Sequence, residues 1–221
     1  MASLRTSLRA APRLFTKPQL ASIYTPAFAV RSFSATARND GRVSDAIIED
    51  HKELKSYYDK IMSSHDPKTQ TEYQNLFVWE LARHSIAEEI VVYPAFEKHV
   101  PDGKNMAKKD RQEHRTVKEK LYEFQKLSWD EPEFKPTLQS LMDDLSHHIK
   151  EEEQDDLPAL EKAIAEADSD RMAKSFERTK MFVPTRSHPS SPDRPPFETA
   201  MGLLAAPMDK LMDMFRKFPH K

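Results

Sequence analysis

A motif that occurs twice in this sequence restricts the possible folds more than any other feature. Residues 84–98 and 148–162 align without a gap as H-x-x-x-E-E-x-x-x-x-P-A-[FL]-E-K. A single histidine precedes each copy, His51 by 33 residues and His114 by 34 residues. Because residues four apart lie on one face of an α-helix, each copy indicates a helix that presents a histidine and a glutamate together. Two copies with matching upstream histidines indicate two similar helical hairpins.

From Ser44 onward, apolar residues spaced three and four apart predict four helices. These helices are expected to begin at Ser44, at Pro67, near residue 105 and after Pro132. The second is long and is expected to end near His99, before the Pro101-Asp102-Gly103 break. Only three glycines occur and strand patterns are missing, which also favours helices. Because the connections are short, we predict an all-α protein with an up-down-up-down four-helix bundle over residues 44–165.

Residues 1–33 have the composition of a mitochondrial transit peptide. They contain five basic residues and no acid, whereas a secretory signal would need an uninterrupted apolar stretch. The segment Arg31-Ser32-Phe33-Ser34 resembles an arginine-directed matrix-protease site, which places cleavage near residue 33. We therefore predict a disordered leader and import into the mitochondrial matrix. Loss of its five positive charges would change the formal net charge from −2 to −7.

Residues 166–221 differ in character from the bundle and are predicted to form a C-terminal extension. A short helix is expected over about 170–180, and the prolines between Pro184 and Pro196 then predict an extended segment. An amphipathic helix follows, whose apolar stripe contains Leu204, Met208, Leu211, Met212 and Phe215. We expect this helix to cover apolar surface of the bundle, with docking to a membrane or protein partner as the alternative.

The composition excludes several kinds of site. Cysteine is absent, which removes disulfides, thiol catalysis, zinc ribbons and iron–sulfur clusters. Basic and acidic residues are interleaved after the leader, so no nucleic-acid-binding patch is predicted. No stretch approaches the roughly 20 apolar residues of a membrane-spanning helix. Because cysteine is absent, any metal would be held by nitrogen and oxygen ligands.

Six residues of the repeated pattern are candidate metal ligands. All fall on the apolar stripes of the predicted helices: His51, His84, Glu88, His114, His148 and Glu152. An ionised glutamate that is buried without a partner costs several kcal/mol, and lysine and arginine are missing from these inner positions. A positive ion is therefore expected between the helices. The remaining acids of the motifs, among them Glu89, Glu153, Asp156 and Glu161, are expected on the solvated faces.

Imidazole and carboxylate together suit iron, with manganese or zinc as alternatives. We predict two non-haem iron ions, one held by His51 and His84 and the other by His114 and His148, with the two glutamates bridging them. An oxo or hydroxo bridge from solvent would complete most of both coordination shells and leave at least one position per ion for a small ligand. A single histidine on an apolar face is usually a core residue. Six potential ligands at repeated offsets favour a metal centre over a metal-free bundle.

The doubled H-x-x-x-E-E…P-A motif resembles that of the hemerythrin-like, or HHE cation-binding, family over residues 44–165. The Glu-x-x-His signature of ferritin-like proteins is absent. The resemblance implies a hemerythrin-like bundle whose two ions bind O₂ or related small molecules. Oxygen-carrying members have a further histidine one turn after the third-helix histidine, whereas this sequence has Lys118 there. The resemblance thus implies a more open centre, and the leader and Pro-rich tail are similar to those of fungal mitochondrial members.

Three functions follow as hypotheses. The first is a di-iron protein that binds or reacts with O₂, NO or peroxide in mitochondria. The second is an iron sensor or reservoir whose folding follows iron supply. The third is a metal-free helical module that binds a protein partner through the C-terminal helix. No acid–base pair apart from the predicted ligands, and no cofactor fingerprint, indicates a catalysed reaction, so the sequence leaves enzyme activity open.

Overall fold

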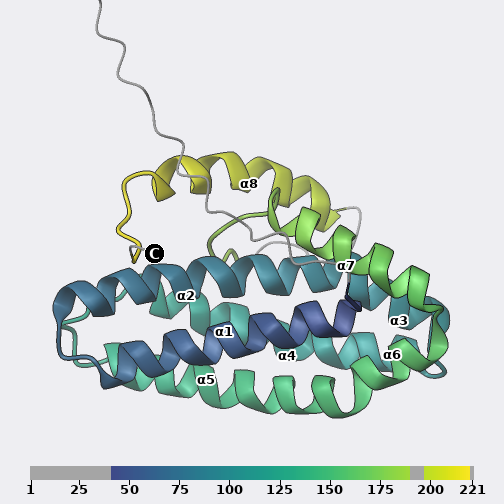
Figure 1. Ribbon diagram of the computed structural model, residues 1–221. Helices are drawn as coiled ribbons and strands as arrows, with labels where there is room; N and C mark the ends of the chain where they lie inside the picture. Colours follow the sequence, from purple (N-terminus) through teal and green to yellow (C-terminus); the bar gives the residue numbers. More distant parts are fainter. Residues whose placement is uncertain (1–40, 190–196, 220–221) are drawn as a thin grey trace, which may run out of the picture. The chain divides into compact units, whose positions relative to one another are not determined.

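The computed structural model describes residues 41–189 and 197–219, and the predicted leader lies outside these ranges. Four antiparallel helices form a bundle, in which the second and fourth each continue through a π-helical turn (Figure 1). They are α1 (Val43–Ser63); α2 (Pro67–Ala87) with η1 (Glu88–Val92) and α3 (Tyr93–His99); α4 (Gly103–Phe124); and α5 (Phe134–Glu151) with η2 (Glu152–Asp156) and α6 (Leu157–Ala163). The described residues contain no strand. The predicted all-α, up-down-up-down four-helix bundle is confirmed.

The connections between the helices follow from local sequence. Asp66 caps α2 by accepting hydrogen bonds from the backbone N–H groups of Lys68 and Thr69, and Pro67 occupies the first helical position. Before α4, Asp102 adopts a left-handed conformation with φ of 61°. The next residue must be glycine, because a Cβ on Gly103 would lie 1.9 Å from the carbonyl oxygen of Phe96.

The two π-helical turns, which the sequence pattern did not predict, begin at the glutamate of each motif. In η1 the N–H of Tyr93 bonds to the carbonyl of Glu88, five residues earlier, and in η2 Leu157 bonds to Glu152 in the same way. The residue that follows each of these donors is a proline, which has no N–H and whose ring clashes with the carbonyl four residues earlier in a regular α-helix. A wider turn accommodates that ring. Such turns within α-helices often occur at functional sites.

Two apolar clusters fill the bundle on either side of the histidines. One contains Leu54, Phe77, Leu81, Val117, Leu121, Phe134, Leu138 and Leu145. The other contains Ile47, Ala87, Val92, Phe96, Ala107, Leu157, Leu160 and Phe176. On each bundle helix the predicted ligand histidine falls between members of the two clusters in the sequence. The site therefore lies at mid-length, where apolar packing on both sides restricts access of water.

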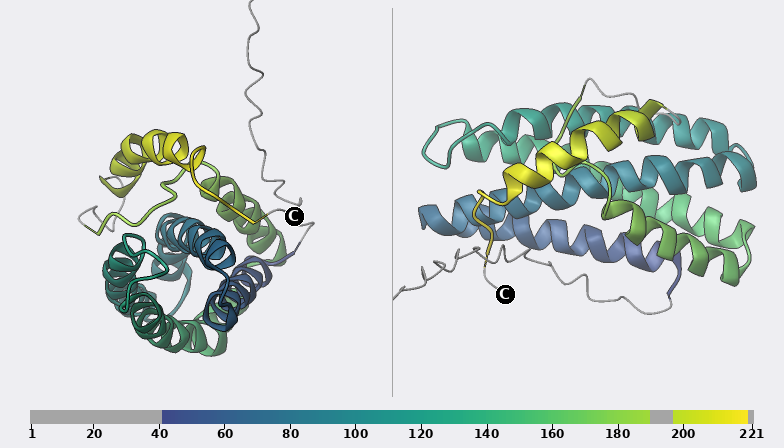
Figure 2. Two further views of the ribbon diagram at one scale, coloured as in Figure 1. Left: turned by 90° about the vertical axis from the view of Figure 1, so that its left-hand side faces the viewer. Right: turned by 90° about the horizontal axis from the view of Figure 1, so that it is seen from above.

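The first helix of the C-terminal extension packs against the bundle and contributes a buried side chain to the core. α7 (Glu166–Lys180) begins earlier than the predicted 170–180 and packs against α1 and α2 on the outside of the bundle (Figure 2). Its Phe176 is fully buried in one of the apolar clusters. Residues 184–189 of the predicted Pro-rich segment are non-helical, and the rest of that segment, residues 190–196, lies outside the described ranges.

The last helix, α8 (Phe197–Asp213), is oriented differently from the prediction. Its apolar residues Met208, Leu211 and Phe215, the last of which follows the helix, are 62%, 52% and 78% exposed and do not cover the bundle. Instead Asp209 is buried and accepts hydrogen bonds from two backbone N–H groups of the preceding loop, those of Thr185 at 3.1 Å and Arg186 at 3.2 Å. These polar contacts turn the apolar stripe toward solvent. No helix in the described part of the chain is long and apolar enough to span a membrane.

Candidate metal centre

All six predicted ligands lie together in the bundle core, and none is more than 3% exposed. Five of the six form two groups of three that share Glu88, and within each group the potential ligand atoms lie within 4.8 Å of one another. One group is His51, His84 and Glu88, and the other is Glu88, His114 and His148. The structure thus brings together the two histidine pairs that the repeat suggested. Their role as ligands stays a prediction.

The two glutamates lie between the histidine pairs. Glu88 is 3.2 Å from Nε2 of His84 and 3.4 Å from Nε2 of His114, measured to its two different oxygens. Glu152 places one oxygen 3.5 Å from Nε2 of His51 and 3.8 Å from Nε2 of His148. Each carboxylate therefore contacts one histidine of each pair, as expected of a group that bridges two ions.

A second set of four carboxylates holds the outer nitrogens of the histidines. The Nδ1–carboxylate distances are 2.8 Å for His51 with Glu153, 3.1 Å for His84 with Asp50, 3.3 Å for His114 with Glu89, and 2.9 Å for His148 with Glu113. A carboxylate at this position favours the tautomer whose proton is on Nδ1. The lone pair of each Nε2 then faces the interior, which is the usual orientation of histidines that bind metals.

The outer carboxylates also follow the internal repeat. Asp50 and Glu113 directly precede the upstream histidines, and Glu89 and Glu153 directly follow the two bridging glutamates. The expectation that Glu89 lies on a solvated face is wrong, because its side chain is fully buried between His114 and Lys118. Asp156 is also buried, and Glu153 is about one-third exposed. Two features of the repeat were the available signals for this second set, namely the second glutamate of each motif and the acid before each upstream histidine.

Two lysines neutralise the two fully buried outer carboxylates. Lys118 forms an ion pair with Glu89, so its ammonium group is directed at this outer carboxylate. Lys180, the last residue of α7, forms an ion pair with Asp50 and a second with Glu80 at 2.7 Å. Because Asp50 contacts His84, Lys180 links α7 to the centre through this carboxylate. Phe176 of α7 also packs edge-to-face on the ring of His84, with the ring centroids 5.8 Å apart.

Five inner atoms of the site lack hydrogen-bonding partners among the described residues. Both oxygens of Glu88, both oxygens of Glu152 and Nε2 of His51 are buried and receive no hydrogen bond. Nε2 of His114 lies 3.0 Å from Nε2 of His148. When the outer carboxylates hold the protons on Nδ1, these are two lone pairs directed at each other. The donor set of four nitrogens and two carboxylates therefore fits cations in the space between the helices.

The pKa values of the same groups show how strongly the site favours positive charge. Burial alone would lower the pKa of His84, but the negative charge of Glu88 and the hydrogen bond to Asp50 raise it to about 10. Burial would raise the pKa of Glu88, but the charge of His84 lowers it to about 2. Burial and the charge of Glu88 raise the pKa of Glu152 well above its usual value. In the absence of a cation, protons on His84 and Glu152 supply the compensating charge.

Tyr93 is a further polar residue at the centre that the sequence pattern did not reveal. It is the first residue after η1, is fully buried, and places its hydroxyl 2.9 Å from Nε2 of His114. Burial raises the pKa of this hydroxyl, so it remains a protonated donor. The second motif has Leu157 at the corresponding position, and the tyrosine therefore occurs on one side of the centre only.

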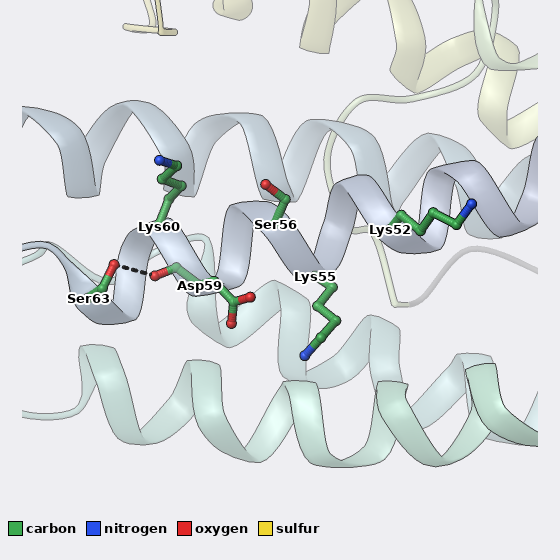
Figure 3. A pocket seen from close by; sticks show the side chains of 6 residues that line it. All are labelled: Lys52, Lys55, Ser56, Asp59, Lys60 and Ser63. Carbon is green, nitrogen blue, oxygen red and sulfur yellow. Dashed lines mark hydrogen bonds between the residues drawn. The ribbon is translucent and has the colours of Figure 1, made fainter.

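A surface pocket on α1 is separate from this centre. Figure 3 shows its six lining residues along one face of α1: Lys52, Lys55, Ser56, Asp59, Lys60 and Ser63. All six are exposed, and none is a predicted ligand. The chemistry described above lies in the buried core.

Comparisons with known proteins agree with this geometry. The family model for the hemerythrin HHE cation binding domain matches residues 42–160. An uncharacterized hemerythrin-like protein of Schizosaccharomyces pombe is 59% identical over 179 residues, which cover 80% of this chain and 88% of that protein. A DNA nickase of Nostoc is 26% identical over 149 residues, or 67% of this chain and 42% of that protein. The crystal structure of a hemerythrin HHE cation binding domain-containing protein from Mycobacterium kansasii matches with a TM-score of 0.56 and 21% identity, covering 64% of this chain and 86% of that one.

Proposed function

Because this chain belongs to the hemerythrin HHE cation-binding family, we propose that it is a non-haem di-iron protein that binds or reacts with O₂, NO or peroxide. One observation carries the proposal. Two buried histidine pairs are joined by Glu88 and Glu152, whose four oxygens receive no hydrogen bond from the described residues. Buried carboxylates without partners are strongly unfavourable unless a cation compensates them.

The residues that would hold the two ions divide by hairpin. His51 and His84 would hold one ion and His114 and His148 the other, with both glutamates shared. Nitrogen and carboxylate donors together suit iron, with manganese or zinc as alternatives. Bound iron would supply the capacity to bind and reduce small ligands such as O₂, NO or peroxide.

The protein itself supplies orientation and a water-poor environment. The outer carboxylates hold Nδ1 of each histidine and so fix the direction of Nε2. The Tyr93 hydroxyl can donate a hydrogen bond to a small polar ligand beside His114. Oxygen carriers have a fifth histidine at the position of Lys118. In this chain Lys118 forms an ion pair with the outer carboxylate Glu89 instead. This supports a more open centre on the side of His114.

Metal analysis joined to spectroscopy tests the proposal. The purified protein should contain close to two irons per chain and, when oxidised, absorb in the near ultraviolet. The variant His84→Ala/His148→Ala should lose both properties. His147→Ala is the matched control, because His147 adjoins His148 but its side chain is 68% exposed. A protein that binds no metal, with stability unchanged by chelators, would contradict the proposal.

An iron sensor or reservoir is the second candidate, and the electrostatics of the site favour it. Without a cation the core holds carboxylates that raise each other's pKa, so the metal-free fold should be weakened. Limited proteolysis with and without a chelator tests this function. Rapid cleavage only in the chelator supports it, and identical cleavage under both conditions contradicts it.

We further propose that the protein acts in the mitochondrial matrix, because residues 1–33 have the composition of a transit peptide. We also propose that α8 and the residues that follow it provide a surface for a protein partner, because the apolar side chains of Met208, Leu211 and Phe215 are exposed. Imaging a reporter fused to residues 1–40 tests the proposed location in mitochondria. Pull-down with Leu211→Ser/Phe215→Ser and wild-type protein tests the surface, since an intact partner set in the variant would argue against it.

A further inference from the structure

Two positions beside the centre break the symmetry of the two hairpins. When His51 is aligned with His114 and His84 with His148, Asp110 corresponds to Ile47 and Asp156 to Val92. Ile47 and Val92 are fully buried members of an apolar cluster. Asp110 and Asp156 are only 1% and 8% exposed. One side of the centre is thus sealed by apolar residues, whereas the other side carries two buried acids.

Asp110 is a buried acid with an unsatisfied oxygen. Its Oδ2 atom receives no hydrogen bond from the described residues. Burial and the charge of Asp156 raise the pKa of Asp110 to about 7. The neighbouring Lys109 is half exposed and contacts Glu113 at 3.7 Å and Glu151 at 2.7 Å. The side chain of Asp110 therefore lies where negative charge accumulates and a cation would be favourable.

The position of Asp110 differs from that of the predicted ligands. Its potential ligand atom lies within 4.8 Å of those of Glu113 and His148, whereas the inner group consists of Glu88, His114 and His148. Glu113 contacts the outer nitrogen of His148, Nδ1, at 2.9 Å. Asp110, Glu113 and His148 therefore form a third group, in which Glu113 lies on the outer side of His148.

Exposure decreases in steps from this group to the centre. The side chain of Glu113 is 22% exposed, Asp156 is 8% exposed, Asp110 is 1% exposed and Glu152 is fully buried. Asp156 follows Glu152 by four residues at the other end of η2, so the two carboxylates lie on the same face of the helix. Carboxylates thus extend from the surface to the bridging glutamate on this side. The corresponding positions of the first hairpin, Ile47 and Val92, offer no such ligands.

We propose that Asp110, Glu113 and Asp156 form a loading site, at which a divalent cation binds through carboxylate oxygens before it passes to the inner group. The inference rests on the proposed di-metal function. An all-oxygen site suits hard divalent cations such as Fe²⁺ and Mn²⁺ and binds them less tightly than a site that also has imidazole. Transfer of a cation to the centre requires that the loading site bind it less tightly than the inner group does. Because the first hairpin is sealed by apolar side chains, cations enter from the second hairpin.

The rate of metal uptake by the full-length, metal-free protein tests this proposal, with Co²⁺ as a coloured probe. Asp110→Asn/Asp156→Asn should slow uptake by about tenfold, the lower end of what electrostatic focusing contributes to association rates. It should still bind the same final amount of Co²⁺ as the wild type. Asp143→Asn/Asp155→Asn is the matched control, because it removes the same charge from exposed positions, and it should load at the wild-type rate.

Two results would overturn the loading site. One is uptake by Asp110→Asn/Asp156→Asn at the wild-type rate. The other is a lower final Co²⁺ content, which would make these acids part of the inner centre. If the double variant does not fold, Asp156→Asn alone, at the more exposed position, gives the same comparison. A wild-type protein that binds no Co²⁺ would instead contradict the di-metal proposal, so the two failures are distinguishable.

Discussion

At the residue scale, each histidine of the centre has two distinct nitrogens with different tasks. Nδ1 contacts an outer carboxylate, and Nε2 faces the shared glutamates. The repeat in the sequence predicted the inner residues because a histidine and a glutamate four apart must share a helix face. It could not predict Tyr93 or the burial of Glu89, because their partner His114 lies on another helix.

Glu88 belongs to both groups of potential ligands, so its removal should affect both ions. Glu88→Gln should lower the affinity for each ion by at least ~10-fold, the smaller end of the loss seen when even outer partners are removed. Titration against a competing chelator measures this. Glu123→Gln is the control, because Glu123 is 65% exposed and pairs with Lys126 rather than with a histidine of the centre. Unchanged affinity for both ions in Glu88→Gln would rule out a bridging role.

Asp110 makes the stability of the metal-free protein depend on pH. Its pKa is raised from 3.8 to about 7 in the folded chain, so the unfolded chain releases this proton at lower pH. The wild type therefore loses stability relative to Asp110→Asn as the pH rises from 4 to 7, by about 1.4 kcal/mol for each pKa unit. The free energy of unfolding can be measured with urea in the presence of a chelator at pH 4 and at pH 8. The difference between Asp110→Asn and the wild type should be larger, in favour of the variant, at pH 8. An equal difference at both pH values would contradict this.

At the element scale, the helices were predictable and the π-helical turns were not. Apolar spacing and the Asp66-Pro67 start located the bundle helices correctly. Spacing cannot distinguish an α-helix that bends at Pro94 from one that inserts a π turn before it, because both keep the apolar stripe. The orientation of α8 also depended on contacts beyond its own sequence, namely those of Asp209 with the loop at Thr185.

α7 is predicted to stabilise both the fold and the centre through Lys180. Lys180→Ala leaves Asp50 and Glu80 buried without their shared cation, and the free energy of unfolding should fall by ~3–5 kcal/mol. Lys109→Ala should cost less than ~1 kcal/mol, because Lys109 is half exposed. Urea unfolding of the two variants gives the comparison. Equal losses would show that α7 is not coupled to the core in this way.

At the scale of the whole molecule, two similar hairpins create one doubled centre, and a few unmatched residues make its two sides different. Tyr93 and the acids Asp110 and Asp156 have apolar counterparts in the other hairpin. The doubling was evident from the sequence, because the two motifs align without a gap. The consequences of the unmatched positions were not, since they depend on which residues meet in the core.

Metal removal should weaken the whole fold, because the site is formed only when all four bundle helices meet. We expect a chelator to lower the midpoint of thermal unfolding of the wild type. The same chelator should have little effect on His84→Ala/His148→Ala, which serves as the control. A similar shift in both proteins would mean that the chelator acts elsewhere.

The central claim is a two-ion centre held by the repeated histidines and glutamates, and anomalous X-ray diffraction at the iron absorption edge tests it most directly. Crystals of the iron-loaded protein should show two peaks, one beside His51 and His84 and the other beside His114 and His148. Both peaks should contact Glu88. No peak between the four bundle helices, or a single peak away from Glu88, would contradict the account.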